Sequence, residues 1–150
     1  MTDTIVVGYD GSEVSRTALE AATDLARAMG SEIMLACMLY QPSIVGFGAS
    51  PPATAALAFL PGINWEKALQ VVADELEAAA TKVRAAGVTC ASTCARGEPA
   101  ESLVGVAKTV CARLIVIGTT GAGSSTGSLG STARRLLETS NVPILMVPKQ

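Results

Sequence analysis

The densest concentration of potential ligand-binding residues is a run rich in glycine and hydroxyl groups, residues 118–132, with the sequence GTTGAGSSTGSLGST. It contains five glycines and eight serines or threonines and precedes a segment with helical periodicity. Glycines let backbone N–H groups approach an anion, and a helix N-terminus adds donors and a favourable dipole. The run therefore predicts a phosphate-binding loop, although it lacks both the Walker ending and a dinucleotide fingerprint after the first strand. A flexible, exposed loop is the alternative that this composition allows.

A carboxylate lies in a second turn-forming segment, GYDGS, at residues 8–12. Beside a glycine, Asp10 can organise the turn and complement the dipole of the helix that follows. At the end of a strand, the same side chain can accept hydrogen bonds from a nucleoside. The residues alone leave both roles open.

The composition narrows the chemistry further. There is no histidine, which removes Ser-His and Cys-His nucleophiles and His-ligated zinc. The four cysteines, at positions 37, 90, 94 and 111, have no CxxC spacing. We expect them to be buried structural thiols in a reducing cytoplasm, and no metal site. A net charge of -2 offers no basic field to a nucleic-acid backbone, so nucleic acid is not an expected partner.

Residues 33–65 form the longest uncharged stretch and include four prolines. Prolines and glycines divide the stretch into pieces too short to span a bilayer, so we expect no membrane span. No signal peptide is expected either, because Asp3 and Asp10 bracket only a short apolar run. Residues 41–64 are predicted to form either a flap over the site or against a partner, or a mobile surface loop.

Short apolar runs alternate with longer segments of helical periodicity, the pattern of doubly buried strands alternating with helices. The predicted strands are residues 5–8, 33–39, 88–95, 114–117 and 144–147. Four helices are predicted. The first follows the N-cap Ser12 and ends at Gly30, and the second runs from Trp65 to Gly87. The third begins at Pro99, and the fourth begins at Ser131 or Thr132 and ends before Pro143. We expect these side chains to face inward: Val14, Ala18, Leu25, Met29, Trp65, Leu69, Val72, Leu76, Ala79, Val83, Leu103, Ala107, Val110, Leu136 and Leu137.

This alternation predicts a single α/β domain over residues 1–150, with a doubly wound, mostly parallel five-stranded sheet and helices on both faces. Ligands of such sheets bind beyond the carboxyl ends of the strands, where the strand order reverses. The loops after residues 8, 39 and 117 are therefore the expected location of a site.

Four segments together resemble the universal stress protein family: IVVGYDGSEVSRTALEAA, GEPAESLVGVA, RLIVIGTTG and NVPILMVP. The resemblance covers essentially the whole chain. It implies a Rossmann-like three-layer sandwich whose parallel sheet has the order 3-2-1-4-5, and a homodimer formed through the C-terminal strand.

Family members that bind ATP carry the pattern G-x-x-G-x9-G-S/T, and the resemblance transfers a site to this chain. In that site the loop holds ribose and phosphates, Asp10 holds the nucleoside, and the backbone at Met38 faces adenine. The predicted loop contacts are Gly118, Gly121, Gly123, Gly130, Ser131 and Thr132.

The chain departs from the family pattern in two respects. The spacing between Gly121 and Gly130 is one residue shorter, and Thr120 and Ala122 occupy positions where arginine or lysine is often found. Triphosphate binding would then depend on amides, hydroxyls and an accompanying Mg²⁺. AMP and cyclic AMP are therefore expected to compete with ATP as the ligand.

Two functions follow from the resemblance. One is a stress-response regulator that binds an adenine nucleotide and reports to an unidentified protein partner; it is not an enzyme, or at most a slow ATPase. The other is a dimeric interaction module of the same fold that binds no nucleotide, which the shortened loop favours.

Overall fold

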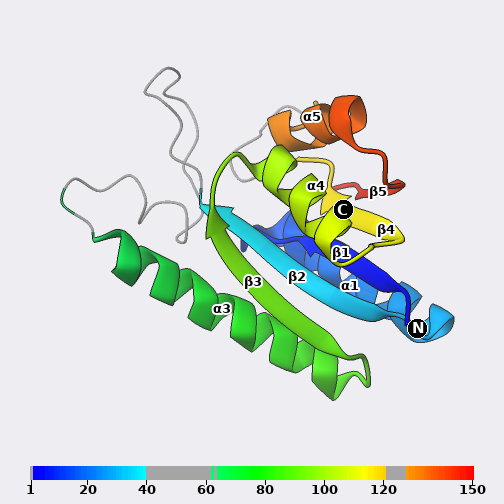
Figure 1. The fold of residues 1–150 in the computed structure, drawn as a ribbon. Helices are drawn as coiled ribbons and strands as arrows, with labels where there is room; N and C mark the ends of the chain where they lie inside the picture. The colour runs from blue at the N-terminus through cyan, green and yellow to red at the C-terminus, as the bar shows by residue number, and fades with distance from the viewer. Residues whose placement is uncertain (1, 40–61, 63, 121–127) are drawn as a thin grey trace.

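The computed structural model describes residues 2–39, 62, 64–120 and 128–150. Strands and helices alternate along the chain and form a three-layer α/β sandwich (Figure 1). The elements are β1 (Thr4–Gly8), α1 (Glu13–Met29), β2 (Glu32–Leu39), α3 (Trp65–Ala85), β3 (Cys90–Arg96), α4 (Pro99–Thr109), β4 (Leu114–Gly118), α5 (Ser131–Thr139) and β5 (Ile144–Val147). The predicted fold class is confirmed.

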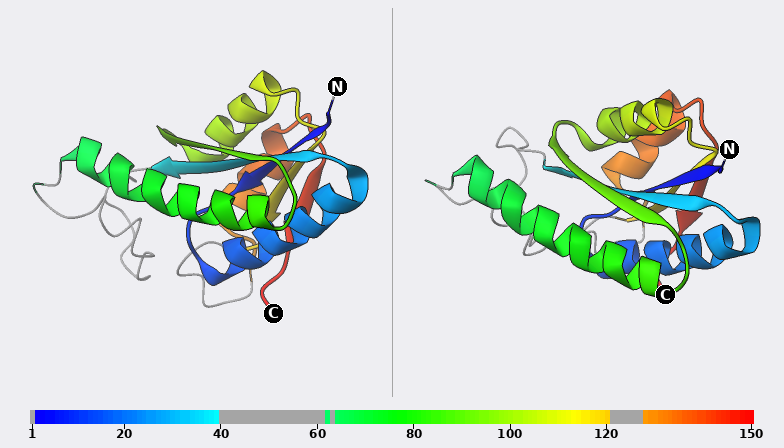
Figure 2. Two further views of the ribbon diagram at one scale, coloured as in Figure 1. Left: turned by 90° about the horizontal axis from the view of Figure 1, so that it is seen from below. Right: turned by 60° about the horizontal axis from the view of Figure 1, so that its bottom comes forward.

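The five strands form one parallel sheet in the order β3-β2-β1-β4-β5. From β1 the chain first adds β2 and β3 on one side and then crosses to add β4 and β5 on the other. Helices α1 and α3 cover one face of the sheet, and α4 and α5 cover the opposite face (Figure 2). The strand order therefore reverses between β1 and β4, as the resemblance implied.

Both faces of the central strands are buried. In β1, Ile5 and Val7 pack toward α1 and α3, whereas Val6 packs toward α4 and α5, and all three side chains are fully buried. Burial on both faces explains why these strands are continuous apolar runs in the sequence.

Local capping determines where several helices begin and end. The hydroxyl oxygen of Ser12 accepts a hydrogen bond from the backbone N–H of Ser15 at 3.2 Å, and Gly30 ends α1 with a left-handed φ of +67°. Pro99 is the first residue of α4, and the Glu98 side chain accepts from the Glu101 N–H at 2.7 Å. These boundaries agree with the predicted ones.

Two side chains predicted to face inward do not. Leu136 is fully buried, but its neighbour Leu137 is 57% exposed, because adjacent residues of a helix point about 100° apart and α5 packs against α4 and β5 along a narrow stripe. Met29 is 42% exposed because it belongs to the last turn of α1, next to the chain reversal at Gly30.

The third strand begins at Cys90, later than predicted. Gly87 has a left-handed φ of +88°, and Val88 is buried with its N–H bonded back to the carbonyl of Val83, so this residue completes the end of α3.

The expectation of four buried cysteines was also wrong: Cys37 and Cys90 are buried, but Cys94 is half-buried and Cys111 is exposed.

Within the part of the chain that the structure describes, no helix is long and apolar enough to span a membrane. The segment 41–64 lies almost wholly outside the described residues. Its last residue, Asn64, is described; it caps α3 by accepting from the Glu66 N–H at 2.9 Å.

Candidate functional site

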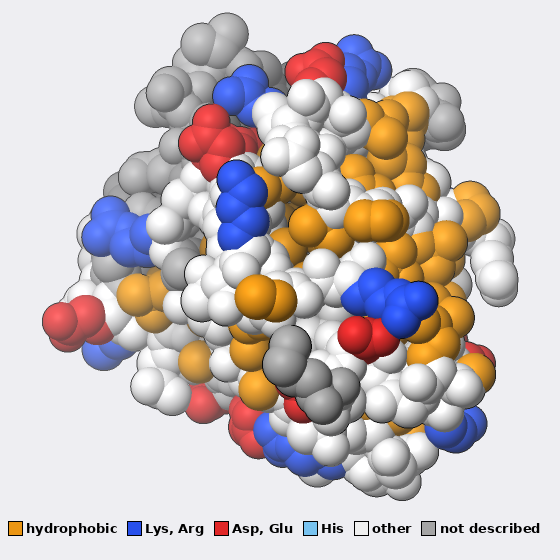
Figure 3. Space-filling view, turned by 45° about the vertical axis from the view of Figure 1, so that its right-hand side comes forward, with side chains coloured by type: hydrophobic (Ala, Val, Ile, Leu, Met, Phe, Trp, Pro, Cys, Tyr) orange, Lys and Arg blue, Asp and Glu red, His pale blue; other side chains and the backbone are white. Residues whose placement is uncertain are grey.

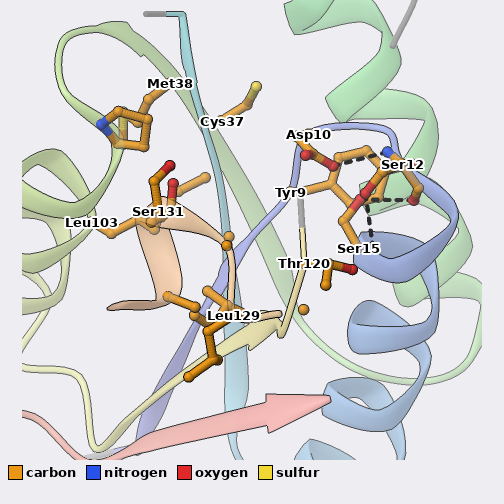
Figure 4. Close-up of a pocket in the computed structure, with 18 residues that line it drawn as sticks. Tyr9, Asp10, Ser12, Ser15, Cys37, Met38, Leu103, Thr120, Leu129 and Ser131 are labelled. Atoms are coloured by element: carbon orange, nitrogen blue, oxygen red, sulfur yellow. Dashed lines mark hydrogen bonds between the residues drawn. The ribbon is translucent and has the colours of Figure 1, made fainter. Parts of the chain in front are cut away.

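A pocket of about 440 Å³ opens beyond the carboxyl ends of β1, β2 and β4, where the strand order reverses (Figure 4). Its described lining comes from the ends of these strands and the first turns of α1, α4 and α5. The lining residues are Gly8, Tyr9, Asp10, Ser12, Ser15, Ala36, Cys37, Met38, Pro99, Leu103, Ile117, Gly118, Thr120, Leu129, Gly130, Ser131, Thr132 and Ala133.

One side of the pocket is the turn between β1 and α1. Asp10 lies here with Ser12 and Ser15, across the pocket from Met38, Leu103 and Ser131 (Figure 4). A carboxylate oxygen of Asp10 accepts a hydrogen bond from the Ser12 N–H at 2.9 Å. This bond holds the carboxylate group at the pocket wall, so the turn-forming role of Asp10 is real and compatible with a ligand contact.

The opposite side begins at the N-terminus of α5. Gly130 is the N-cap residue and, being glycine, brings no capping side chain of its own, and no acidic residue lies in the first turn of the helix. The first N–H groups of any helix lack intrahelical acceptors and carry a partial positive charge. In α5, the residues of this turn, Ser131, Thr132 and Ala133, line the pocket.

The ends of the glycine-rich loop are joined by backbone hydrogen bonds. The Gly130 N–H donates to the carbonyl of Thr119 at 2.8 Å, and the Thr119 N–H donates to the carbonyl of Val147 at 2.9 Å. The loop therefore leaves β4 and returns to the same place, which brings the N-terminus of α5 to the end of the strand.

Apolar side chains form the third part of the wall. Leu103 and Pro99 project from α4, Met38 lies near the end of β2, and Leu129 precedes α5 (Figure 4). Leu103 is 4% exposed, whereas Leu129 is 40% exposed at the pocket. Such a surface suits a planar, weakly polar ring, and the polar groups opposite suit a sugar and an anion.

Gly118 lines the pocket, but its lack of a side chain has a packing role. A Cβ atom built on Gly118 would collide with the buried side chain of Val14 in α1. The glycine therefore permits α1 to pack closely against β4, and this requirement is independent of any phosphate.

The structure brings six of the eight predicted site residues into one pocket: Asp10, Met38, Gly118, Gly130, Ser131 and Thr132. Gly121 and Gly123 lie outside the described residues. Their roles toward a ligand, and those of the six, remain predictions.

Several lining residues were not predicted as site residues. Pro99 and Leu103 were recognised only as a helix start and a core position, and Thr120 only as a substitution in the family pattern. Because their apolar or hydroxyl character is common in cores and loops, the signal that places them at the site is their position after or beside the carboxyl ends of the strands.

The pocket contains one thiol, Cys37. Burial, followed by the neighbouring charges of Cys94 and Asp10, raises the pKa of this thiol from 9.0 to about 12. A thiol with this pKa stays protonated near neutral pH, whereas nucleophilic cysteines require a lowered pKa. Cys37 therefore contributes packing to the pocket wall.

A family model matches residues 1–148 of the chain, and it is described as the universal stress protein family. The chain belongs to this family. The universal stress protein MJ0531 of Methanocaldococcus jannaschii is 30% identical over 97% of this chain and 81% of its own length.

Solved structures with the universal stress protein fold are also similar to the chain. Hypothetical protein MJ0577 has a TM-score of 0.80 at 18% identity, covering 100% of this chain and 98% of its own, which supports the fold. A universal stress protein solved in complex with cAMP has a TM-score of 0.64 at 26% identity, covering 97% and 96% of the two chains.

Proposed function

We propose that this universal stress protein binds an adenine nucleotide (ATP, AMP or cyclic AMP) in the pocket at the carboxyl ends of β1, β2 and β4, and acts as a stress-response regulator. The observation that carries the proposal is that Asp10 and the N-terminus of α5, whose N-cap residue is a glycine, lie on opposite sides of one cavity. A carboxylate can accept hydrogen bonds from ribose hydroxyls, and helix amides can donate to a phosphate.

The cAMP complex of a relative 26% identical to this chain supports the assignment, because it is a family member with an adenine nucleotide bound. The apolar wall supports it as well. Met38 and Leu103 lie on the same side of the pocket as Ser131, so a base packed against them would lie near the N-terminus of α5 (Figure 4). A Mg²⁺ ion accompanying a polyphosphate would take oxygen ligands, and Asp10 supplies one at the pocket.

We propose binding and signalling as the primary activity, with ATP hydrolysis at most slow. Phosphoryl transfer needs a residue that positions or deprotonates the nucleophile and groups that neutralise the developing charge. Among the described lining residues, Asp10 is the one carboxylate, there is no lysine or arginine, and the thiol of Cys37 stays protonated.

The test is to denature the purified protein and analyse released small molecules by chromatography, followed by calorimetric titration with adenosine, AMP, cyclic AMP and ATP. A ligand at a hundred times its Kd should add about 2.7 kcal/mol to the free energy of unfolding, which is a rise in Tm of about 5–10 °C. Gly130→Val places a side chain where α5 meets the pocket and should weaken binding by about tenfold or more. Gly105→Ala, on the exposed side of α4, is the matched control and should leave binding unchanged.

If no adenine nucleotide is released and none binds at millimolar concentrations, the nucleotide proposal fails and the interaction-module function takes its place. Equal affinities for the wild type and Gly130→Val would also contradict the pocket assignment. Retained thermal stability of Gly130→Val in the absence of ligand shows that the variant is folded.

We also propose that two copies associate through β5. Among the described strands this one is at the edge of the sheet and pairs with β4 alone, and apolar side chains gather on the side of the molecule that carries α5 and β5 (Figure 3). An exposed edge strand with apolar side chains is stabilised when a second strand covers it. Leu145 on this strand is 37% exposed.

Analytical ultracentrifugation of Leu145→Lys should show a weaker dimer than the wild type. Val71→Lys, at a similarly exposed apolar position on α3, introduces the same charge on another face and should leave the dimer unchanged. A wild-type protein that stays monomeric at high micromolar concentration would contradict this proposal.

The four cysteines are free thiols, which supports a location in the reducing cytoplasm.

A further inference from the structure

Two of the four cysteines lie opposite each other on neighbouring strands. In the parallel pairing of β2 with β3, Cys37 is the partner of Cys94, and each is two residues before the end of its strand. Both belong to the hydrophobic cluster that the sheet forms with α1 and α3, so both side chains project from the same face of the sheet. Cys37 is 6% exposed, Cys94 is half-buried, and both are free thiols. The register therefore places two thiols side by side.

The other two cysteines have no such partner. Cys90 is paired with Ile33, four residues before Cys37 on β2, which separates these two cysteines by about 13 Å along the strand direction. Cys111 is exposed and lies between α4 and the start of β4, at the end of the sheet opposite to the pocket. Since all four cysteines are among the described residues, Cys37 and Cys94 are the one pair that the register brings together.

The spacing of neighbouring strands meets the main requirement of a disulfide bond. Adjacent strands lie about 4.7–4.9 Å apart, and a disulfide joins residues whose Cα atoms are about 4.4–6.8 Å apart. The Cβ atoms must approach to about 3.5–4.5 Å, so one strand has to shift by a fraction of an ångström. Strand β3 can make this shift, because among the described strands it is at the edge of the sheet and pairs with β2 alone.

The two sulfur atoms are accessible to a small oxidant but react slowly with it. Cys37 lines the pocket of about 440 Å³ (Figure 4), and its half-buried partner lies next to it. Burial raises the pKa of both thiols, that of Cys37 to about 12, and the neighbouring Cys94 contributes to the shift at Cys37. Because the thiolate is the reactive form, we expect a brief pulse of oxidant to leave the pair reduced and a sustained exposure to oxidise it.

We propose that Cys37 and Cys94 form a modification site, at which hydrogen peroxide converts the two thiols into a disulfide that links β2 to β3 beside the pocket. The Cys94 thiol loses its proton to solvent, and its sulfur attacks one peroxide oxygen. The O–O bond breaks, the other oxygen leaves and takes up a proton to become water, and Cys94 becomes a sulfenic acid.

The second step closes the disulfide. The sulfur of Cys37 attacks the sulfur of Cys94, the S–O bond breaks, and the hydroxide leaves as water with the proton of Cys37. The two thiols together lose two electrons, which the peroxide gains, and the products are one disulfide and two water molecules. A small dithiol such as dithiothreitol returns the pair to the reduced state by thiol–disulfide exchange.

The disulfide would restrain the end of β3. In the reduced protein this edge strand is joined to β2 by hydrogen bonds, which continue beyond the strand to the Gly97 N–H and the carbonyl of Leu39 at 3.1 Å. A covalent link between the two strands opposes local opening, so the amides of β3 should exchange with solvent more slowly after oxidation. This consequence does not depend on whether the pocket binds a nucleotide.

The experiment uses the full chain with Cys111→Ala, which removes the exposed thiol. The protein is kept in millimolar hydrogen peroxide for several hours, and the remaining thiols are blocked with N-ethylmaleimide in denaturant before the intact mass is measured. We expect the treated chain to lose the mass of two hydrogen atoms and to take up one maleimide, on Cys90, where the untreated chain takes up three. Dithiothreitol applied after the peroxide should restore the uptake of three.

Cys94→Ala and Cys90→Ala, each added to Cys111→Ala, are the matched variants, because both positions lie on the same face of β3. Cys94→Ala should keep both of its remaining thiols after peroxide. Cys90→Ala should form the disulfide and take up no maleimide. Cooperative thermal unfolding of both variants before treatment shows that each is folded, and hydrogen exchange at β3 should slow in Cys90→Ala alone.

Three results would overturn the proposal. One is a treated chain that still takes up three maleimides or that gains oxygen atoms without losing two hydrogens. Another is a disulfide in Cys94→Ala, which would join a different pair of residues. The last is a covalent dimer of Cys90→Ala on a gel without reductant, because the bond would then join two chains.

Discussion

Replacing Gly118 by alanine should destabilise the protein through packing, even without a ligand. The new methyl group would collide with the side chain of Val14, which is 6% exposed in the interface between α1 and β4. β4 is held by β1 on one side and β5 on the other, so the strand cannot shift alone. The helix must move or Val14 must leave its favoured rotamer.

The expected cost can be worked out from these contacts. Overpacking a well-packed core lowers the free energy of unfolding by about 1–3 kcal/mol. Alanine has a lower chain entropy than glycine in the unfolded state, which raises the free energy of unfolding by about 0.5–1 kcal/mol. A net loss of about 1–2 kcal/mol should lower Tm by about 2–8 °C in a chain of this length. Val14→Ala alone removes two buried methyl groups and should cost about 1.6 kcal/mol.

The double variant Val14→Ala/Gly118→Ala is the decisive measurement. In this variant the methyl group at position 118 occupies space that the Val14 side chain fills in the wild type. The loss in the free energy of unfolding should therefore be about 2 kcal/mol smaller than the sum of the losses in the two single variants. Urea unfolding curves give all three values. Losses that add to within about 0.5 kcal/mol would refute the packing role of Gly118 and return it to a ligand-binding role alone.

Three further predictions concern stability. Gly105→Ala should raise the free energy of unfolding, measured in urea, by about 0.5–1 kcal/mol, because a Cβ there meets no atom within 4 Å and glycine weakens a helix interior. A lower free energy of unfolding would contradict this. Leu136→Ala should lower the free energy of unfolding by about 2–5 kcal/mol, and Leu137→Ala should lower it by less than about 0.5 kcal/mol. Equal losses would show that α5 does not bury Leu136 in preference to Leu137. Folding raises the pKa of the Cys37 thiol from 9.0 to about 12. Because the folded state favours the protonated thiol, the stabilisation that this residue provides is complete below pH 9 and is lost as the pH rises through about 12. Urea unfolding between pH 8 and pH 11 should therefore show a shallower decline for Cys37→Ala than for the wild type, with Cys111→Ala, at an exposed position, as the control.

Much of the fold could be predicted because its causes are local. Ser12 and Gly30 terminate α1 through a side-chain cap and a left-handed φ, and both signals are visible in the sequence. Doubly buried strands are continuous apolar runs, so β1, β2 and β4 were located to within a residue. The exposure of Leu137 could not be predicted, because it depends on the stripe of α5 that rests on its neighbours.

The candidate site was predictable to a smaller extent. Asp10, in the turn after β1, and Ser131, at the start of α5, carry polar groups that the topology brings together, and their position followed from the order of the elements. Leu103 and Pro99 enter the wall because α4 begins beside the carboxyl end of β2, where the Gly97 N–H donates to the carbonyl of Leu39, and no residue type reveals this arrangement. The packing requirement at Gly118 depends on how closely α1 approaches β4, a distance that is set by tertiary structure.

Helix α5 is the shortest of the described helices, with nine residues, and only Ala133 and Leu136 are buried. An element anchored by so few side chains detaches locally at a lower free-energy cost than the central sheet. Any molecule that grips its first turn must therefore bias an equilibrium between docked and detached states of the C-terminal region. Occupancy of the cavity would then be transmitted through the short connection after Ser140 to β5, the strand at which we propose that two copies associate, without a change of fold.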